Sequence, residues 1–260
     1  MERICHGAES QEKILSSVVM IASGKGGTGK STVACNLGLT WQIQGEKTIL
    51  IDMSPNARCL DLYLGVENFA LFDIRDILTG VCSTDRGILT APHLSGLQLI
   101  PGAQTESVQW LRKETLGSLV EVLKYRYDWI ILDCPPGAGE ILSTCASVSD
   151  GGIVVLTPDW PSLRAAQAAE EVMLENQVMS RGYILNRVIQ DLEEKKLELD
   201  YRTVDEALRC ESLGAVLEDQ NIRAAGAMGI PIVAKQDTYI AENFKRMARE
   251  IRTRLYDEEW

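Results

Sequence analysis

Two lysines lie five positions apart in one glycine-rich stretch: Lys25 and Lys30 belong to G-K-G-G-T-G-K-S, residues 24–31. This stretch, called the phosphate loop below, satisfies the pattern G-x-x-x-x-G-K-S/T, in which glycines let backbone N–H groups approach phosphates. An apolar helical pattern follows it, so phosphates would also meet the positive end of a helix. The sequence therefore predicts that Lys30 neutralises β and γ oxygens and that the Ser31 hydroxyl ligates Mg²⁺. A surface turn before a helix is the alternative.

Lys25 has no obvious place in the same cradle, because two ammonium groups in one pocket repel each other. Its side chain can instead point outward, toward a nucleotide held by a second molecule. The other interpretation is a solvated loop lysine without a catalytic role.

A second candidate site follows the apolar run W-I-I-L at residues 129–132, which ends in Asp133 and the turn C-P-P-G. A carboxylate there would hold Mg²⁺ through water, because Mg²⁺ keeps much of its hydration shell. Gly137, which closes the turn, is expected to bring its N–H near the γ-phosphate, since glycine adopts turn conformations freely. Asp133 could also be a helix N-cap, but the phosphate loop favours the metal role, with Ser31 and Asp133 as the metal ligands.

Short apolar runs alternate with helical patterns along the chain and would position these residues. The runs expected to form buried strands are residues 18–22, 48–52, 97–101, 129–133, 152–157, 182–186, 213–217 and 230–233. Several are apolar throughout, as expected when helices cover both faces of a sheet. We therefore predict an α/β fold with a single doubly wound, mostly parallel sheet of about eight strands. Ligands of such sheets bind beyond the carboxyl ends of the strands.

Composition narrows the class of protein. The chain has 260 residues, 45% of them hydrophobic, and a net charge of −11, which disfavours nucleic acid as a partner because DNA-coating proteins need cations. No apolar run approaches the length of a membrane span, and no secretory signal is evident. The seven cysteines never show C-x-x-C spacing, which favours reduced thiols in a cytosolic protein over disulfides or a zinc site. We expect one cytoplasmic domain over residues 1–260, with an N-terminal extension (1–16) and a C-terminal helix and acidic tail (238–260).

Residues 25–32, K-G-G-T-G-K-S-T, resemble the deviant Walker A motif of the MinD/ParA family of ATPases. The stretch R-C-L-D-L-Y-L-G-V-E-N at residues 58–68 resembles R-x-L-D-x-x-x-G-x-E-N of the MinD branch. The resemblance covers about residues 18–255. It implies a homodimer that forms on binding Mg²⁺ and ATP and separates after hydrolysis, with Lys25 acting in trans on the partner's nucleotide.

The resemblance also implies an adenine site. Asn186 in Y-I-L-N-R matches an asparagine whose amide donor and acceptor read adenine, although alone it would be a turn former. L-G-A-V-L-E-D at residues 213–219 resembles the adenine loop, with Leu217 in place of the usual proline. The candidate nucleotide-binding residues are Gly24, Lys25, Gly26, Gly27, Thr28, Gly29, Lys30, Ser31, Thr32, Gly137, Asn186, Arg187, Glu218 and Asp219. The candidate catalytic residues are Lys25, Lys30 and Asp52.

Two positions depart from the family's pattern. Ser54 stands where the family usually carries an aspartate associated with positioning the attacking water. Serine can hydrogen-bond water but cannot stay anionic, so we expect slow hydrolysis and a long-lived ATP state. Asp52 remains a candidate for ordering the Mg²⁺ shell. Ala165 also replaces a common aspartate, which weakens the implied coupling to a membrane or a protein partner.

The last apolar residues repeat at helical spacing with basic residues between them. This pattern is typical of an amphipathic helix on an anionic membrane, or of a helix packed on the sheet with its charges in water. Residues 257–260, D-E-E-W, would repel anionic lipid and favour the packed helix, and no C-terminal anchor follows. Cys134 and Cys145 lie near the turn at Gly137 and could bridge a 4Fe–4S cluster across a dimer, but buried thiols are favoured.

The function expected from the resemblance is MinD-like placement of the cell-division site, through a nucleotide-gated surface for a MinC- or MinE-like regulator. The alternatives are an ATPase for flagellar placement or metallocentre maturation, a DNA partition ATPase, and a slow or degenerate ATP-binding scaffold.

Overall fold

The computed structural model describes residues 16–55, 57–105, 107–194 and 198–256. Within them, eight strands form one sheet in the order β3-β4-β2-β5-β1-β6-β7-β8. Neighbouring strands run parallel except β3 and β4. The strands are β1 Ser17–Ala22, β2 Thr48–Asp52, β3 Leu89–Ala91, β4 Leu97–Ile100, β5 Trp129–Asp133, β6 Gly151–Leu156, β7 Ser180–Val188 and β8 Glu211–Leu217.

Helices connect the strands. The longer ones are α1 Lys30–Ile43, α5 Lys113–Lys124, α7 Trp160–Glu175, α10 Gln220–Ala227 and α11 Tyr239–Tyr256. The shorter ones are α2 Leu60–Tyr63, α3 Ile74–Leu78, α4 Thr84–Gly87, α6 Glu140–Ala146, α8 Gln190–Glu194 and α9 Tyr201–Ala207. Three-residue 3₁₀ turns lie at η1 Glu67–Phe69, η2 Pro92–Leu94 and η3 Ile232–Ala234.

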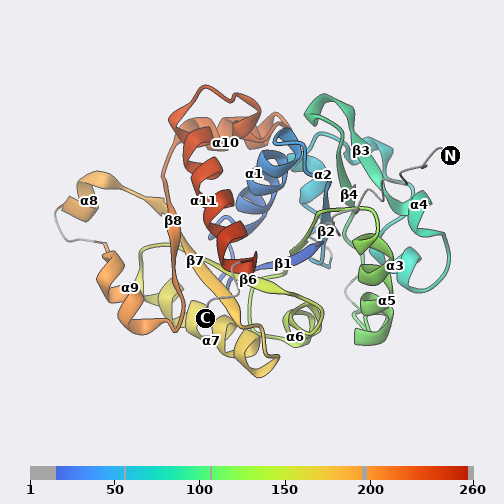
Figure 1. The fold of residues 1–260 in the computed structure, drawn as a ribbon, viewed down its shortest axis with the longest axis horizontal. Helices are drawn as coiled ribbons and strands as arrows, with labels where there is room; N and C mark the ends of the chain where they lie inside the picture. The colour runs from blue at the N-terminus through green and yellow to red at the C-terminus, as the bar shows by residue number, and fades with distance from the viewer. Residues whose placement is uncertain (1–15, 56, 106, 195–197, 257–260) are drawn as a thin grey trace, which may run out of the picture.

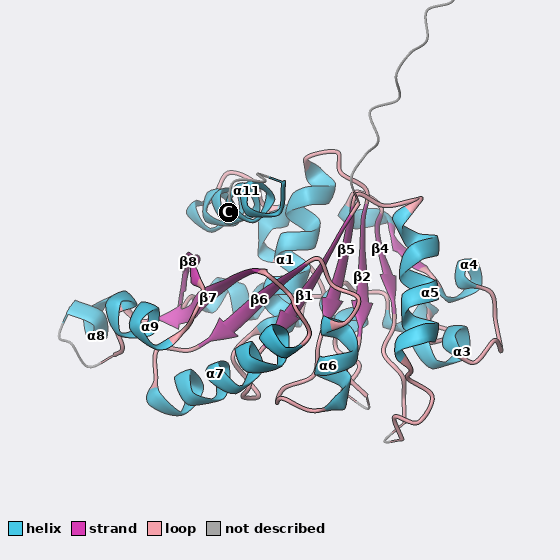
Figure 2. Cartoon of the chain, turned by 60° about the horizontal axis from the view of Figure 1, so that its bottom comes forward, coloured by secondary structure: helices cyan, strands magenta, loops and turns pink. Residues whose placement is uncertain are grey.

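The sheet is buried on both faces, which explains its apolar strands. Side chains of β1 alternate between two hydrophobic clusters: Val18 and Met20 belong to one, Val19 and Ile21 to the other. Helices α1 and α11 pack on one face, while α5, α6 and α7 pack on the opposite face (Figures 1 and 2). The predicted doubly wound α/β architecture is confirmed.

Two expectations about the strands need correction. Residues 230–233 form no strand: Pro231 lacks a backbone N–H, and the Val233 N–H donates to Asn36 Oδ1 at 3.2 Å beside the η3 turn. The eighth strand is instead β3, which pairs antiparallel with β4 at the edge of the sheet. Its three residues are too few to show a periodicity.

The C-terminal helix is a core element. Ile240, Phe244, Met247 and Ile251 of α11 are each 5% exposed or less and lie in the cluster that contains α1. The prediction of a helix packed on the sheet is therefore confirmed. In the described segments, no helix is long and apolar enough to cross a membrane. The expected N-terminal extension and the acidic tail at 257–260 fall outside the described residues, apart from residue 16.

Candidate nucleotide-binding site

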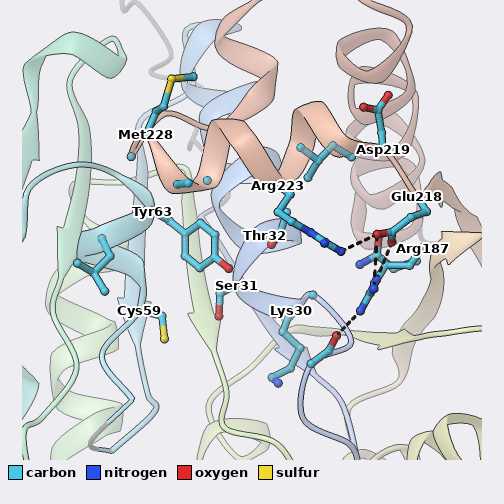
Figure 3. A pocket seen from close by; sticks show the side chains of 18 of the residues that line it. Lys30, Ser31, Thr32, Cys59, Tyr63, Arg187, Glu218, Asp219, Arg223 and Met228 are labelled. Atoms are coloured by element: carbon cyan, nitrogen blue, oxygen red, sulfur yellow. Dashed lines mark hydrogen bonds and ion pairs between the residues drawn. The ribbon is translucent and has the colours of Figure 1, made fainter.

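A pocket of about 800 Å³ opens where the parallel strands end, between the N-terminus of α1 and helices α2 and α10 (Figure 3). It brings together residues that lie far apart in the sequence. The predicted residues that line it are Gly27, Gly29, Lys30, Ser31, Thr32, Asn186, Arg187, Glu218 and Asp219.

Close backbone packing shapes the phosphate loop. A Cβ on Gly24 would lie 1.8 Å from the carbonyl oxygen of Ala165 in α7, so only glycine fits there. Gly29 has a φ of 93°, and a Cβ on it would lie 2.1 Å from Asn186 Nδ2. That same nitrogen donates to the Thr28 carbonyl at 2.6 Å. Asn186 thus holds the phosphate loop through its amide nitrogen. Its contact with adenine stays a prediction, and the amide oxygen is the atom that would make it.

The loop leads directly into α1. Lys30, Ser31 and Thr32 are the first residues of this helix, where backbone N–H groups have no intrahelical acceptor. Burial lowers the pKa of Lys30, while the nearby Asp133 carboxylate opposes this effect. The helix end and the ammonium group together form a site for the oxygens of a phosphate chain.

Ser31 and Asp133 meet at the predicted metal position. Ser31 Oγ donates to Asp133 Oδ2 at 2.6 Å, and Asp133 Oδ1 is buried without a hydrogen-bond partner among the described residues. Burial, together with the Asp52 charge, raises the pKa of Asp133 to about 7. An unpartnered carboxylate oxygen beside a hydroxyl fits Mg²⁺, which prefers hard oxygen ligands. These two residues would hold the ion, which neutralises phosphate charge when bound.

Asp52 lies beside Asp133 in the sheet register but serves another contact. Its carboxylate accepts hydrogen bonds from the backbone N–H groups of Ser54, Cys59 and Leu60, at 2.9, 2.9 and 3.2 Å. Burial raises its pKa, and these N–H groups oppose the shift. Asp52 therefore braces the segment that leads into α2, and its catalytic role stays a prediction.

Lys25 points away from the pocket that contains Lys30. Its Nζ lies 3.2 Å from Asp159 Oδ1, and the two side chains are 46% and 40% exposed. Asp159 also caps α7 by accepting the Ser162 N–H, and it accepts a hydrogen bond from the Thr157 hydroxyl. Burial tends to raise the pKa of Asp159, but these partners lower it overall. The sequence showed the separation of the two lysines but not the acidic partner.

Gly137 is placed differently from the expectation. Its N–H donates to the Ser23 carbonyl at 2.9 Å, and its φ is 103°. The turn therefore adopts the glycine conformation predicted for it, but in this arrangement the Gly137 N–H is already bonded to a protein carbonyl.

Gly26 of the phosphate loop is exposed, and a Cβ on it would meet open space.

Ion pairs of Glu218 with two arginines lie at one end of the pocket (Figure 3). Glu218 accepts from Arg187 Nε at 2.6 Å and from Arg223 Nη2 at 2.9 Å. Arg187 has a φ of 63°, unusual for a residue other than glycine. Asp219 caps α10 by accepting the Asn221 N–H. Arg223 was not expected in the site; its only sequence signal is its position one helical turn after Asp219.

The segment around helix α2 supplies lining residues that the sequence analysis did not select, among them Cys59, just before the helix, and Leu62 and Tyr63 within it. Arg58 and Asp61 of the R-x-L-D motif have a structural role, because Arg58 Nε donates to the buried Asp61 carboxylate. Gly65 and Glu67, two later positions of the same motif, also line the pocket, so the motif contributes both to the fold of this segment and to the site.

Comparisons with known proteins identify the family of the chain. The family model ParA, described as NUBPL iron-transfer P-loop NTPase, matches residues 14–252. The chain belongs to the ParA family of P-loop NTPases. The septum site-determining protein MinD of Synechocystis is 29% identical over 91% of this chain and 90% of its own length. MinD of Bacillus subtilis is 28% identical over 91% and 89%.

Solved structures extend the agreement to the fold. MinD in the MinC:MinD cell division complex of Aquifex aeolicus aligns with a TM-score of 0.83 and 26% identity, over 91% of this chain and 96% of its own. MinD of Pyrococcus horikoshii, solved with Mg-ADP, aligns with a TM-score of 0.80 and 27% identity over the same shares. The resemblance to the MinD/ParA family is confirmed, and the chain is an ATPase of that family.

Proposed function

We propose that this ParA-family ATPase dimerises on binding Mg²⁺ and ATP and acts as a switch in placing the cell-division site. The observation that carries the proposal is the cluster of Lys30, Ser31 and Asp133 at the N-terminus of α1. It occurs in a chain that aligns over about nine-tenths of its length with proteins named MinD. The ligands are ATP and Mg²⁺, and the ATP-bound dimer would present a surface to a MinC- or MinE-like regulator; MinD of Aquifex aeolicus was solved in a complex with MinC. We place the protein in the cytoplasm, with peripheral membrane contact as a further option.

Dimerisation is proposed to use Lys25. Its ion pair with Asp159 is solvent-exposed, and such pairs contribute only about 0.2–1 kcal/mol. The phosphates of a nucleotide in a second copy carry more charge than one carboxylate and can compete for the ammonium group. Lys25 would then leave Asp159 and complete the partner's site.

Light scattering after size exclusion tests this arrangement directly. With Mg²⁺ and a non-hydrolysable ATP analogue the wild type should be a dimer, and with ADP a monomer. Lys25→Ala should bind the analogue and stay monomeric. A wild type that stays monomeric at saturating analogue would overturn the proposal. In cells, loss of the protein should misplace septa and change cell length.

Hydrolysis is proposed to be slow because of Ser54. The Ser54 backbone N–H donates a hydrogen bond to the Asp52 carboxylate. Ser54 therefore begins the segment between β2 and α2 that this carboxylate holds in place. Ser54→Asp should raise kcat, because an anionic side chain polarises the attacking water better than a hydroxyl. Ser54→Ala, the matched control, should not. A folded Ser54→Asp variant with unchanged turnover counts against this role.

Ser54 supports one alternative function, that of a scaffold which binds ATP and dimerises but hydrolyses ATP at a negligible rate. The dimerisation and turnover assays separate the two. An assay for iron and acid-labile sulfide tests the alternative of a cluster bridged by Cys134 and Cys145, both of which are fully buried. ATP-dependent retention of DNA would support partition instead.

A further inference from the structure

One side of α2 belongs to the pocket and the other to the core. Leu60 and Leu64 are fully buried in the cluster that contains α1. Cys59, at the start of the helix, and Tyr63, one turn later, both line the pocket. Helix α2 therefore presents Tyr63 to whatever occupies the space above the N-terminus of α1.

The position of the Tyr63 ring is fixed by α10. A Cβ on Gly226 would lie 2.8 Å from Tyr63 Cε1 and 3.2 Å from Cδ1, so the ring rests against helix backbone where any side chain would collide. The ends of the two helices also meet, because a Cβ on Gly229 would lie 2.7 Å from Gly65 Cα. These contacts hold the half-buried ring across the pocket rather than in solvent.

The hydroxyl of Tyr63 points toward Ser31 at the start of α1 (Figure 3). It has no hydrogen-bond partner within the part of the chain that the structure describes, although a phenol in a partly buried place ordinarily finds one. The groups around the start of α1 are themselves donors: the first N–H groups of the helix and the Lys30 ammonium. Phosphoryl oxygens held by these donors are acceptors to which the Tyr63 hydroxyl can donate as well.

We propose that the Tyr63 hydroxyl donates a hydrogen bond to a phosphoryl oxygen of the bound nucleotide. Tyr63 would then be a nucleotide-binding residue on α2, the helix that follows the backbone N–H groups bound by the Asp52 carboxylate. The inference rests on the proposed function, because it assumes that a nucleotide occupies the pocket. It joins α2 to the phosphate chain, so the segment from Asp52 to Tyr63 is held at both ends when nucleotide is bound.

Calorimetry with Mg²⁺ and ADP tests the contact in Tyr63→Phe, which removes only the hydroxyl. Tyr125→Phe is the matched control, because Tyr125 is 90% exposed and does not line this pocket. Tyr63→Phe should bind ADP about tenfold more weakly, as expected for a lost hydrogen bond to a charged group, and Tyr125→Phe should match wild type. The same penalty should persist with 2′,3′-dideoxy-ADP.

A second variant tests the placement of the ring. Gly226→Ala favours helix but displaces the ring, so it should weaken ADP binding without lowering the melting temperature. Combined with Tyr63→Phe, it should add little to the loss. Unchanged ADP binding by Tyr63→Phe would overturn the inference, and so would a penalty that disappears with the dideoxy nucleotide, which would assign the contact to the ribose. A wild type that binds no ADP at all would instead defeat the proposed function.

Discussion

Replacing Asp133 with asparagine should change how the stability of the metal-free protein depends on pH. Asp133 is fully buried, its Oδ1 has no partner among the described residues, and its pKa is raised from 3.8 to about 7. A carboxyl whose pKa is higher in the folded than in the unfolded chain stabilises the fold while protonated. That contribution is complete below the unfolded pKa of 3.8 and is lost as the pH rises through about 7.

The magnitude follows from the size of the shift. A difference of about 3 pKa units corresponds to about 4 kcal/mol, and roughly two of those units act between pH 5 and pH 8. The wild type should therefore lose about 3 kcal/mol of unfolding free energy relative to Asp133→Asn over this interval. Any constant cost of burying the asparagine amide cancels, because only the change with pH is compared.

Urea unfolding in the presence of a chelator measures this difference. Tryptophan fluorescence can report it, since Trp41 and Trp129 are buried and stacked at 4.0 Å in the core. Mg²⁺ at pH 8 should stabilise the wild type more than Asp133→Asn, because the substitution removes the negative charge that faces the ion beside Ser31. If the stability difference between the two proteins were the same at pH 5 and pH 8, burial would not control the ionisation of Asp133.

Other contacts make further predictions. Gly24→Ala should abolish ATP binding and lower the melting temperature, because its Cβ would lie 1.8 Å from the Ala165 carbonyl oxygen; Gly26→Ala, whose Cβ meets open space, should leave the melting temperature unchanged. Equal behaviour of the two variants in a thermal-shift and ATP-binding assay would contradict this. Asp159→Asn keeps a helix-capping side chain but frees Lys25, so sedimentation should show tighter ATP-dependent dimers. The gain should reach at most about thirtyfold, because two exposed ion pairs of up to about 1 kcal/mol each no longer have to be broken per dimer; weaker dimers would refute the competition between Asp159 and nucleotide.

The phosphate loop could be predicted because its chemistry is local. Glycines, Lys30 and Ser31 are consecutive in the sequence, and the strand before them and the helix after them are visible in the same short window. The central strands were equally clear, because burial on both faces makes them apolar throughout. The error at residues 230–233 arose because a short apolar run alone does not define a strand: Ile230 is exposed, and the backbone hydrogen bonds go to a turn and to Asn36.

Only the tertiary structure decided which groups become partners. The sequence places an acid at Asp52 but does not show that backbone N–H groups surround it, and it separates Lys25 from Lys30 without showing Asp159. Tyr63 and Arg223 enter the pocket because α2 and α10 fold over the start of α1. Spacing along a chain determines which residues share a loop or a helix face, whereas a contact across elements depends on how sheet and helices pack, and packing is a property of the whole fold.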